Sequence, residues 1–167
     1  MNTIDERLMH APADTCFTVA ADVERWPALL PHYRWVRFLS RDGFGTGTVE
    51  MAAWRVFAGP VRYPTRWISE MSIDTQQPVV RYTHIGGITR GMAVEWRFEP
   101  RPEGTHVCIT HEWVGPGWPL IGRFAADRII GPHFVSAIAQ RTLAGVAAEA
   151  ERRASAHGHE AGQRARP

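Results

Sequence analysis

The sequence predicts an α+β protein in which a curved antiparallel sheet of seven strands packs around one long C-terminal helix, with two short helices closing one end. Six segments between residues 34 and 114 have the composition of strands, and short turns containing Gly or Pro separate them. Turns this short join antiparallel neighbours, because a parallel crossover needs about a dozen residues or more. After residue 119 the apolar residues change to helical spacing, which continues to about Arg153.

The first part of the chain predicts one strand and two short helices. Residues 7–10 are a short strand candidate, and Asp14 is placed to cap the helix that follows it. A proline pushes the preceding residue out of the α region, so Trp26, which precedes Pro27, is expected to end this helix. Residues 28–30 add one further turn.

The later strands and the long helix follow in order. The strands are predicted at residues 34–40, 47–57, 61–73, 79–85, 91–99 and 105–114. Gly131-Pro132 interrupts the helical pattern, so a kink or break is expected there. Residues 154–167 have no large apolar side chain and are expected to form a mobile tail, so a single folded domain covers residues 1–153.

The composition excludes several classes of protein. The chain has 167 residues, enough for one domain, and its formal net charge of +2 gives no support to nucleic-acid binding. No run approaches the roughly 18 apolar residues of a membrane span, and the N-terminal residues lack the pattern of a secretory signal, so a cytoplasmic location is expected. All 19 basic residues are arginine, which excludes lysine Schiff bases and lysine-dependent phosphate loops.

Strand alternation predicts which side chains face the helix, because successive residues of a strand point to opposite sides. In the last four predicted strands an apolar or aromatic face alternates with a polar one. In the strand at 47–57 each face has one charge, so Trp54 is a weaker candidate for the inner face. The side chains with aromatic rings or polar tips that are expected to face inward are Tyr63, Thr65, Trp67, Tyr82, His84, Trp96, His111 and Trp113.

Two interpretations of this inner face stay open. Inward aromatic residues belong to a packed core in most antiparallel sheets. Two histidines and two tyrosines on one inner face instead favour a cavity, because each buried polar tip needs a hydrogen-bond partner that water or a ligand can supply. The helical spacing places Phe134 and Ile138 on the side of the helix that faces the sheet.

The sequence predicts no metal or cofactor. His106 and His111 are five residues apart on one predicted strand, so they face opposite sides and cannot bind one ion. The glycines at residues 43–47 lie between two strands, whereas a dinucleotide-binding motif requires a strand, a loop and a helix. Cys16 and Cys108 are too few for a disulfide framework.

The end of the first helix resembles a known family. The stretch DVERWP at residues 22–27, continuing through Leu30 and Tyr33 into the next strand, is similar to a helix-end motif of the START-like superfamily. Within this superfamily the sequence most resembles the bacterial polyketide cyclase/dehydrase and coenzyme-Q-binding branch, over residues 7–153. The resemblance implies the helix-grip fold, with a deep apolar cavity between the sheet and the helix.

The resemblance also implies a protein that binds a hydrophobic small molecule, and it leaves two functions open. One is an aromatase/cyclase that performs aldol cyclisation and dehydration of an aromatic polyketide-like substrate, with an acyl carrier protein or a second copy of the chain as partner. The other is a non-catalytic carrier or chaperone for a quinone or another lipid. The implied proton-handling residues are Tyr33, Thr65, His84 and His111. The expected ligand-binding residues are Trp26, Leu30, Trp54, Tyr63, Trp67, Tyr82, Trp96, Trp113, Phe134, Ile138 and Arg141.

One position departs from the family's pattern. The family has an arginine, suited to binding an enolate oxygen, at the position where this chain has Trp67. Two residues earlier, Thr65 keeps the hydroxyl of the family's serine. Arg141, on the predicted C-terminal helix, is the candidate that could replace the missing guanidinium.

Overall fold

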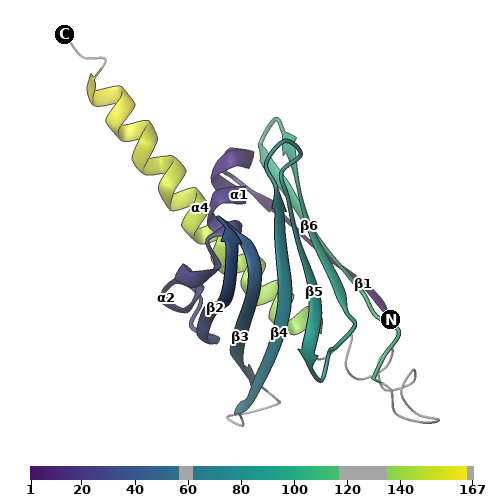
Figure 1. Cartoon of the computed structure of the whole chain (residues 1–167). Helices are drawn as coiled ribbons and strands as arrows, with labels where there is room; N and C mark the ends of the chain where they lie inside the picture. Colours follow the sequence, from purple (N-terminus) through teal and green to yellow (C-terminus); the bar gives the residue numbers. More distant parts are fainter. Residues whose placement is uncertain (57–61, 117–134, 165–167) are drawn as a thin grey trace.

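One antiparallel sheet curves around the long helix α4 (Ser136–Arg164), as Figure 1 shows. This computed structural model describes residues 1–56, 62–116 and 135–164. The strands are β1 (Asn2–Met9), β2 (Tyr33–Gly43), β3 (Thr46–Val56), β4 (Arg62–Asp74), β5 (Val79–Gly87), β6 (Ala93–Arg101) and β7 (Gly104–Glu112). The predicted fold, seven antiparallel strands around a long C-terminal helix, is confirmed.

The strands lie in the order β1-β7-β6-β5-β4-β3-β2, and all neighbouring pairs are antiparallel. From β2 to β7, each strand pairs with the next one in the sequence. The first strand, β1, pairs with the last, β7. Asn2 lies opposite Glu112, and Met9 lies opposite Thr105. β1 therefore begins earlier than the strand predicted at residues 7–10, because pairing with β7 orders its charged first half as well.

Two short helices and a 3₁₀ turn connect β1 to β2: α1 (Ala13–Ala21), η1 (Val23–Arg25) and α2 (Trp26–Leu29). Asp14 does not cap α1, since Pro12 occupies the N-cap position and Asp14 lies in the first turn. The expectation that Trp26 ends a helix is also wrong, because Trp26 is helical (φ −55°, ψ −40°) and begins α2. Pro27 fits there because the N–H groups of the first helical turn have no acceptor within the helix, so a proline loses no hydrogen bond at this position.

Helix α4 continues past Arg153 to Arg164, so its predicted end is wrong. Figure 1 shows its last turns extending beyond the edge of the sheet. Residues 154–164 contain no proline, and their alanines together with Glu160, Gln163 and Arg164 allow a helix that is already nucleated by its packed part to continue through two glycines. The predicted break at Gly131-Pro132 lies outside the described residues. Of the helices within the described ranges, none is both long enough and apolar enough to cross a membrane.

A buried carboxylate identifies the outer face of β3. Glu50 is 1% exposed and accepts hydrogen bonds from Arg37, at 2.6 Å, and from Arg66, both of which are themselves exposed. Residues in phase with Glu50 therefore face away from α4. Trp54 is one of them, and the guanidinium of Arg34 lies 4.4 Å from the centre of its ring. The prediction that Trp54 faces inward is wrong, because the arginines that decide the face belong to neighbouring strands.

Candidate functional site

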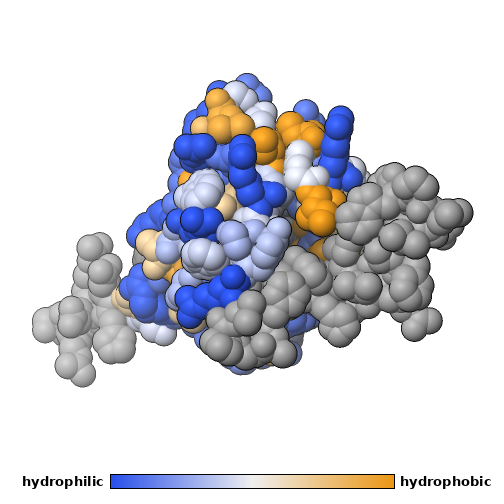
Figure 2. All heavy atoms as spheres, turned by 90° about the horizontal axis from the view of Figure 1, so that it is seen from below, coloured by the Kyte–Doolittle hydropathy of each residue, from blue (hydrophilic) through white to orange (hydrophobic). Residues whose placement is uncertain are grey.

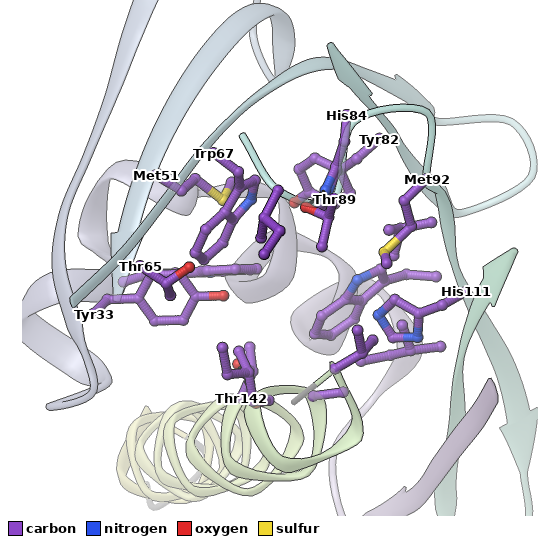
Figure 3. Close-up of a pocket in the computed structure, with 18 residues that line it drawn as sticks. Tyr33, Met51, Thr65, Trp67, Tyr82, His84, Thr89, Met92, His111 and Thr142 are labelled. Carbon is purple, nitrogen blue, oxygen red and sulfur yellow. Dashed lines mark hydrogen bonds between the residues drawn. The ribbon is translucent and has the colours of Figure 1, made fainter. Parts of the chain in front are cut away.

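A cavity lies between α4 and the inner face of the sheet. Its volume is about 100 Å³, whereas a single water needs about 10–15 Å³ by the same measure. Figure 3 shows the side chains of the sheet and those of α4 converging on this space. The lining residues are Trp26, Tyr33, Met51, Thr65, Trp67, Tyr82, His84, Ile88, Thr89, Met92, Val94, Trp96, Ile109, His111, Val135, Ile138, Ala139 and Thr142.

Aromatic rings in mutual contact form much of the wall. The ring of Trp26 packs against Tyr33 with centroids 5.1 Å apart, and against Trp96 at 5.8 Å. Trp67 continues this series, at 6.2 Å from Tyr33 and stacked on His84 at 6.1 Å. The Nε1 of Trp26 donates to the backbone carbonyl of Val19 at 3.3 Å, so its only N–H is already used. The rings therefore present mainly apolar surface to the cavity.

The two histidines of the wall are uncharged at neutral pH. Nδ1 of His84 lies 2.7 Å from Oγ1 of Thr89, and burial together with the neighbouring His111 lowers the pKa of His84 to about 3. Nδ1 of His111 lies 3.1 Å from Oγ1 of Thr3. Burial lowers the pKa of His111 to about 4. A neutral imidazole has one nitrogen that donates and one that accepts, so each ring can exchange a proton with a bound molecule.

Hydroxyl groups supply the other polar points of the wall. Burial raises the pKa values of Tyr33 and Tyr82, so both phenols keep their O–H groups. The hydroxyl of Tyr82 is buried and has no hydrogen-bond partner among the described residues. Thr142 on α4 donates to the carbonyl of Ile138 at 2.8 Å. A buried donor without a partner is costly, so Tyr82 is suited to bind an acceptor on a ligand.

Among the described residues, the lining contains no Asp, Glu, Lys or Arg side chain. With neutral histidines and protonated tyrosines, this described part of the wall is uncharged. Within the described part of the chain, no group of three potential metal ligands occurs. This arrangement suits an uncharged, largely apolar molecule with oxygen acceptors, because burying an ion without a partner is strongly unfavourable.

The four residues expected to handle protons all line the cavity, and so do several expected ligand-binding residues. Those placed together as expected are Tyr33, Thr65, His84, His111, Trp26, Trp67, Tyr82, Trp96 and Ile138. Alternation along the strands placed most of them correctly, because the polar and apolar faces of β5, β6 and β7 separate cleanly.

The prediction that Tyr63 binds the ligand is wrong, because its side chain is 57% exposed and does not line the cavity. It is in phase with Thr65 and Trp67, but it lies near the start of β4, opposite Arg55 of β3. The pairing of β4 with β5 begins only at Trp67. Phase along a strand predicts the face correctly here, but it does not predict how far along the strand the cavity extends.

Three further expected residues lie elsewhere, and one is outside the described residues. Trp113 is buried, but its Nε1 donates to the backbone carbonyl of Arg90 at 2.9 Å, and it does not line the cavity. Leu30 is buried against α4 instead. Arg141 is exposed, because its position on α4 points to solvent, so it does not replace the missing guanidinium. Phe134 lies outside the described ranges.

The sequence predicted a turn between β5 and β6 but not that its side chains line the cavity. Ile88 and Thr89 of this turn line the cavity, and Thr89 contacts His84. Gly87 has a φ of +93°, and a Cβ there would lie 2.7 Å from the backbone oxygen of Arg66, so the turn requires glycine at this position. Three glycines within residues 86–91 marked a turn in the sequence, but alternation stops there and gives no side-chain direction.

Fold and cavity together define a helix-grip protein with an internal apolar site. The family described as polyketide cyclase / dehydrase and lipid transport matches residues 9–129, and the chain belongs to this family. A putative polyketide cyclase of Streptomyces cyaneus is 30% identical over 113 residues, which cover 67% of this chain and 72% of that protein.

Solved structures share the fold. The Zhui aromatase/cyclase of Streptomyces sp. R1128 aligns with a TM-score of 0.74 and 24% identity, covering 92% of this chain and 94% of that one. A START superfamily protein of Mycobacterium smegmatis aligns with a TM-score of 0.62 and 16% identity, covering 92% and 97%. The resemblance drawn from residues 22–27 is therefore confirmed at the level of family and fold.

Proposed function

We propose that the protein binds an uncharged, aromatic polyketide-like molecule in this cavity and promotes its aldol cyclisation and dehydration. The observation that carries the proposal is the uncharged aromatic wall with His111, His84, Tyr33 and Tyr82 directed into one space. Family membership supports the reaction class, and the apolar, uncharged lining of the cavity supports the ligand class. No cofactor is required for this chemistry.

The proton steps can be assigned to groups of the wall. A neutral histidine removes a proton from a carbon between two ketones, while a tyrosine O–H donates a hydrogen bond to the adjacent carbonyl oxygen, giving an enolate and an imidazolium. The enolate carbon then forms a bond to a second carbonyl carbon, whose oxygen takes the proton back from the imidazolium and becomes a hydroxyl. In the dehydration, the neutral histidine removes another α-proton and passes it to the hydroxyl, which leaves as water.

His111 is the better base of the two histidines. Nδ1 of His84 is engaged with Thr89 at 2.7 Å, and its ring is stacked on Trp67. Nδ1 of His111 faces Thr3 of β1 at the longer distance of 3.1 Å, and the pKa of His111, about 4, lies above that of His84, about 3. The hydroxyl of Tyr82, which has no hydrogen-bond partner among the described residues, is the corresponding donor. It takes over, as a neutral hydrogen bond, part of the oxyanion stabilisation that the family's arginine would give at Trp67.

A second function is supported by the lining that the structure describes, because no cationic side chain belongs to it. A carrier for a quinone needs only an apolar wall and donors for the two carbonyl oxygens, and Tyr33 and Tyr82 fit that role. Such a carrier would bind its ligand without changing it. Partners other than this small molecule, including an acyl carrier protein or a second copy of the chain, would meet the protein at its surface.

Native mass spectrometry of the purified full chain, followed by extraction of any bound compound, distinguishes the two functions. A bound polycyclic aromatic compound supports the cyclase, and an isoprenoid quinone supports the carrier. A synthetic linear aryl β-triketone then tests catalysis directly through the absorbance of the cyclised aromatic product. Tyr82→Phe should slow this reaction, whereas Thr83→Val, on the exposed face of the same strand, should not. Equal rates with and without the protein would reject the catalytic proposal.

A further inference from the structure

A buried carboxylate lies directly behind the proposed base. Thr3 and Asp5 are on the inner face of β1, where Thr3 lies opposite His111 and Asp5 lies opposite Ile109 in the register with β7. Asp5 is only 3% exposed. An ionisable group is rarely buried this deeply unless it is paired or has a function. Its position is not explained by the sheet, whose β1–β7 pairing uses only backbone groups.

The hydrogen bonds of Asp5 leave one oxygen unused. Oδ1 accepts a hydrogen bond from Nε2 of Gln140 on α4 at 2.9 Å. Oδ2 has no hydrogen-bond partner among the described residues and lies 3.9 Å from Nδ1 of His111. Burial raises the pKa of Asp5, while hydrogen bonds from Gln140 and Ser136 oppose that change. The free oxygen of the carboxyl group is thus directed at the side of the imidazole that faces away from the ligand.

Groups from several elements surround the His111 ring. Thr3 and Asp5 approach Nδ1 from β1, and His84 of β5 is the other titratable group near it in the cavity. On β6 its neighbour across the sheet is the apolar Val94. No cation is among these groups. The Thr3 hydroxyl can donate or accept a hydrogen bond, so the Asp5 carboxylate, which only accepts, is the group that favours a proton on Nδ1.

We propose that Asp5 is a positioning residue that holds His111 with its proton on Nδ1, leaving the lone pair of Nε2 directed into the cavity. A histidine whose second nitrogen faces a carboxyl group has its tautomer and ring orientation fixed by that partner. When Nε2 takes a proton from the ligand, the ring becomes an imidazolium, and Asp5 is the acidic group next to its new charge. This inference builds on the proposed function, in which His111 is the base.

The tautomer can be measured without any activity assay. In a two-bond ¹⁵N–¹H correlation spectrum of the full chain with ¹⁵N-labelled histidine, His111 should show the pattern of the Nδ1–H tautomer. Asp5→Asn places an amide N–H₂ near Nδ1, which favours an accepting Nδ1, so the signal should change to the Nε2–H pattern. A wild-type His111 with its proton on Nε2 would overturn the proposal, and this result needs no variant to fold.

Glu6→Gln provides the matched control. Glu6 is the next residue of β1, but it lies outside the cavity, 3.6 Å from Nε2 of His106. This variant should alter the His106 signals and leave His111 unchanged. In the triketone assay, Asp5→Asn should lower kcat by about 10–100-fold, as loss of an orienting partner does elsewhere, with unchanged binding of an apolar probe. An unchanged His111 tautomer in folded Asp5→Asn would also overturn the proposal. Failure of the wild type to bind any apolar probe would instead reject the proposed function.

Discussion

The two faces of the sheet differ in the charge of their ionisable groups: the carboxylates Glu50 and Glu95 on the outer face are charged, and the histidines of the inner face are neutral. On the outer face, burial alone would raise the pKa values of Glu50 and Glu95, but paired arginines lower them, so both carboxylates stay charged. On the inner face, burial lowers the pKa values of His84 and His111, so both stay neutral. The same alternation of residues thus produces a charged outer face and an uncharged cavity wall, with the carboxyl group of Asp5 behind that wall, and this wall is what an uncharged ligand requires.

The view of the molecule from below shows hydrophobic and hydrophilic residues mixed on the surface (Figure 2). Ile88 of the β5–β6 turn is 50% exposed and also lines the cavity. The turn is therefore a place where the apolar interior approaches solvent at the ends of two central strands.

The largest effect should come from placing a charge on the wrong face of β3. Val49 is fully buried on the inner face, and Thr48 precedes it on the outer face, opposite Glu70. Val49→Lys should lower the free energy of unfolding by about 3–5 kcal/mol, because the ammonium has no partner there. Thr48→Lys should change it by less than about 0.5 kcal/mol. Urea denaturation measures both, and equal losses would mean that the two faces do not differ as described.

The histidines should make stability depend on pH. Their pKa values in the folded protein, about 3 for His84 and about 4 for His111, lie below the ordinary 6.5. As pH falls below 6.5, the unfolded chain binds protons that the folded protein does not, so stability decreases by about 1.4 kcal/mol per pH unit for each histidine.

A pH series of urea denaturation curves from 7 to 4 tests this prediction in the wild type and in His111→Gln. The variant should show a slope smaller by the contribution of one histidine. His10→Gln, at an exposed position, serves as the control. A slope that His111→Gln leaves unchanged would show that this imidazole is not kept neutral by burial.

A smaller effect is expected from Glu50→Gln. The substitution removes a charge that Arg37 and Arg66 hydrogen-bond, so it should cost about 1–3 kcal/mol at pH 7. The pKa of Glu50 is lowered in the folded protein, so this stabilisation is complete above about 4.5, the ordinary value, and is lost as pH falls through the lowered pKa. Glu99→Gln, whose carboxylate is exposed beside Arg101, should have almost no effect. A wild-type advantage that persists at low pH would contradict this account.

The sequence predicted the fold and the middle of the site because both depend on local patterns. Alternation in β6 and β7 is clean, so Trp96 and His111 could be assigned to the inner face before the structure was known. In β3 the pattern failed for Trp54, since one charge lies on each face and the deciding arginines come from other strands. Pairing across the sheet is not readable from one strand alone.

Asp5 illustrates a second kind of failure. The charged residues near the N-terminus do not look like a strand, so the predicted strand began only at residue 7. Pairing with β7 makes these residues an edge strand and buries Asp5 beneath Gln140 of α4, a residue more than a hundred positions away in the chain. A contact between residues this distant depends on the assembled fold, and no local periodicity signals it.

The central claim, that the inner tryptophans surround a ligand site, is tested most directly by binding of an uncharged apolar probe such as N-phenyl-1-naphthylamine. Trp96 lines the cavity, whereas Trp54 lies on the outer face under Arg34. The wild type and Trp54→Ala should bind the probe with equal affinity and show quenched tryptophan fluorescence. Trp96→Ala should bind it more weakly, at a cost in stability below the 3–5 kcal/mol typical of a tightly packed aromatic residue. No probe binding to the wild type, together with a full loss of that size in Trp96→Ala, would mean that the interior is a filled core.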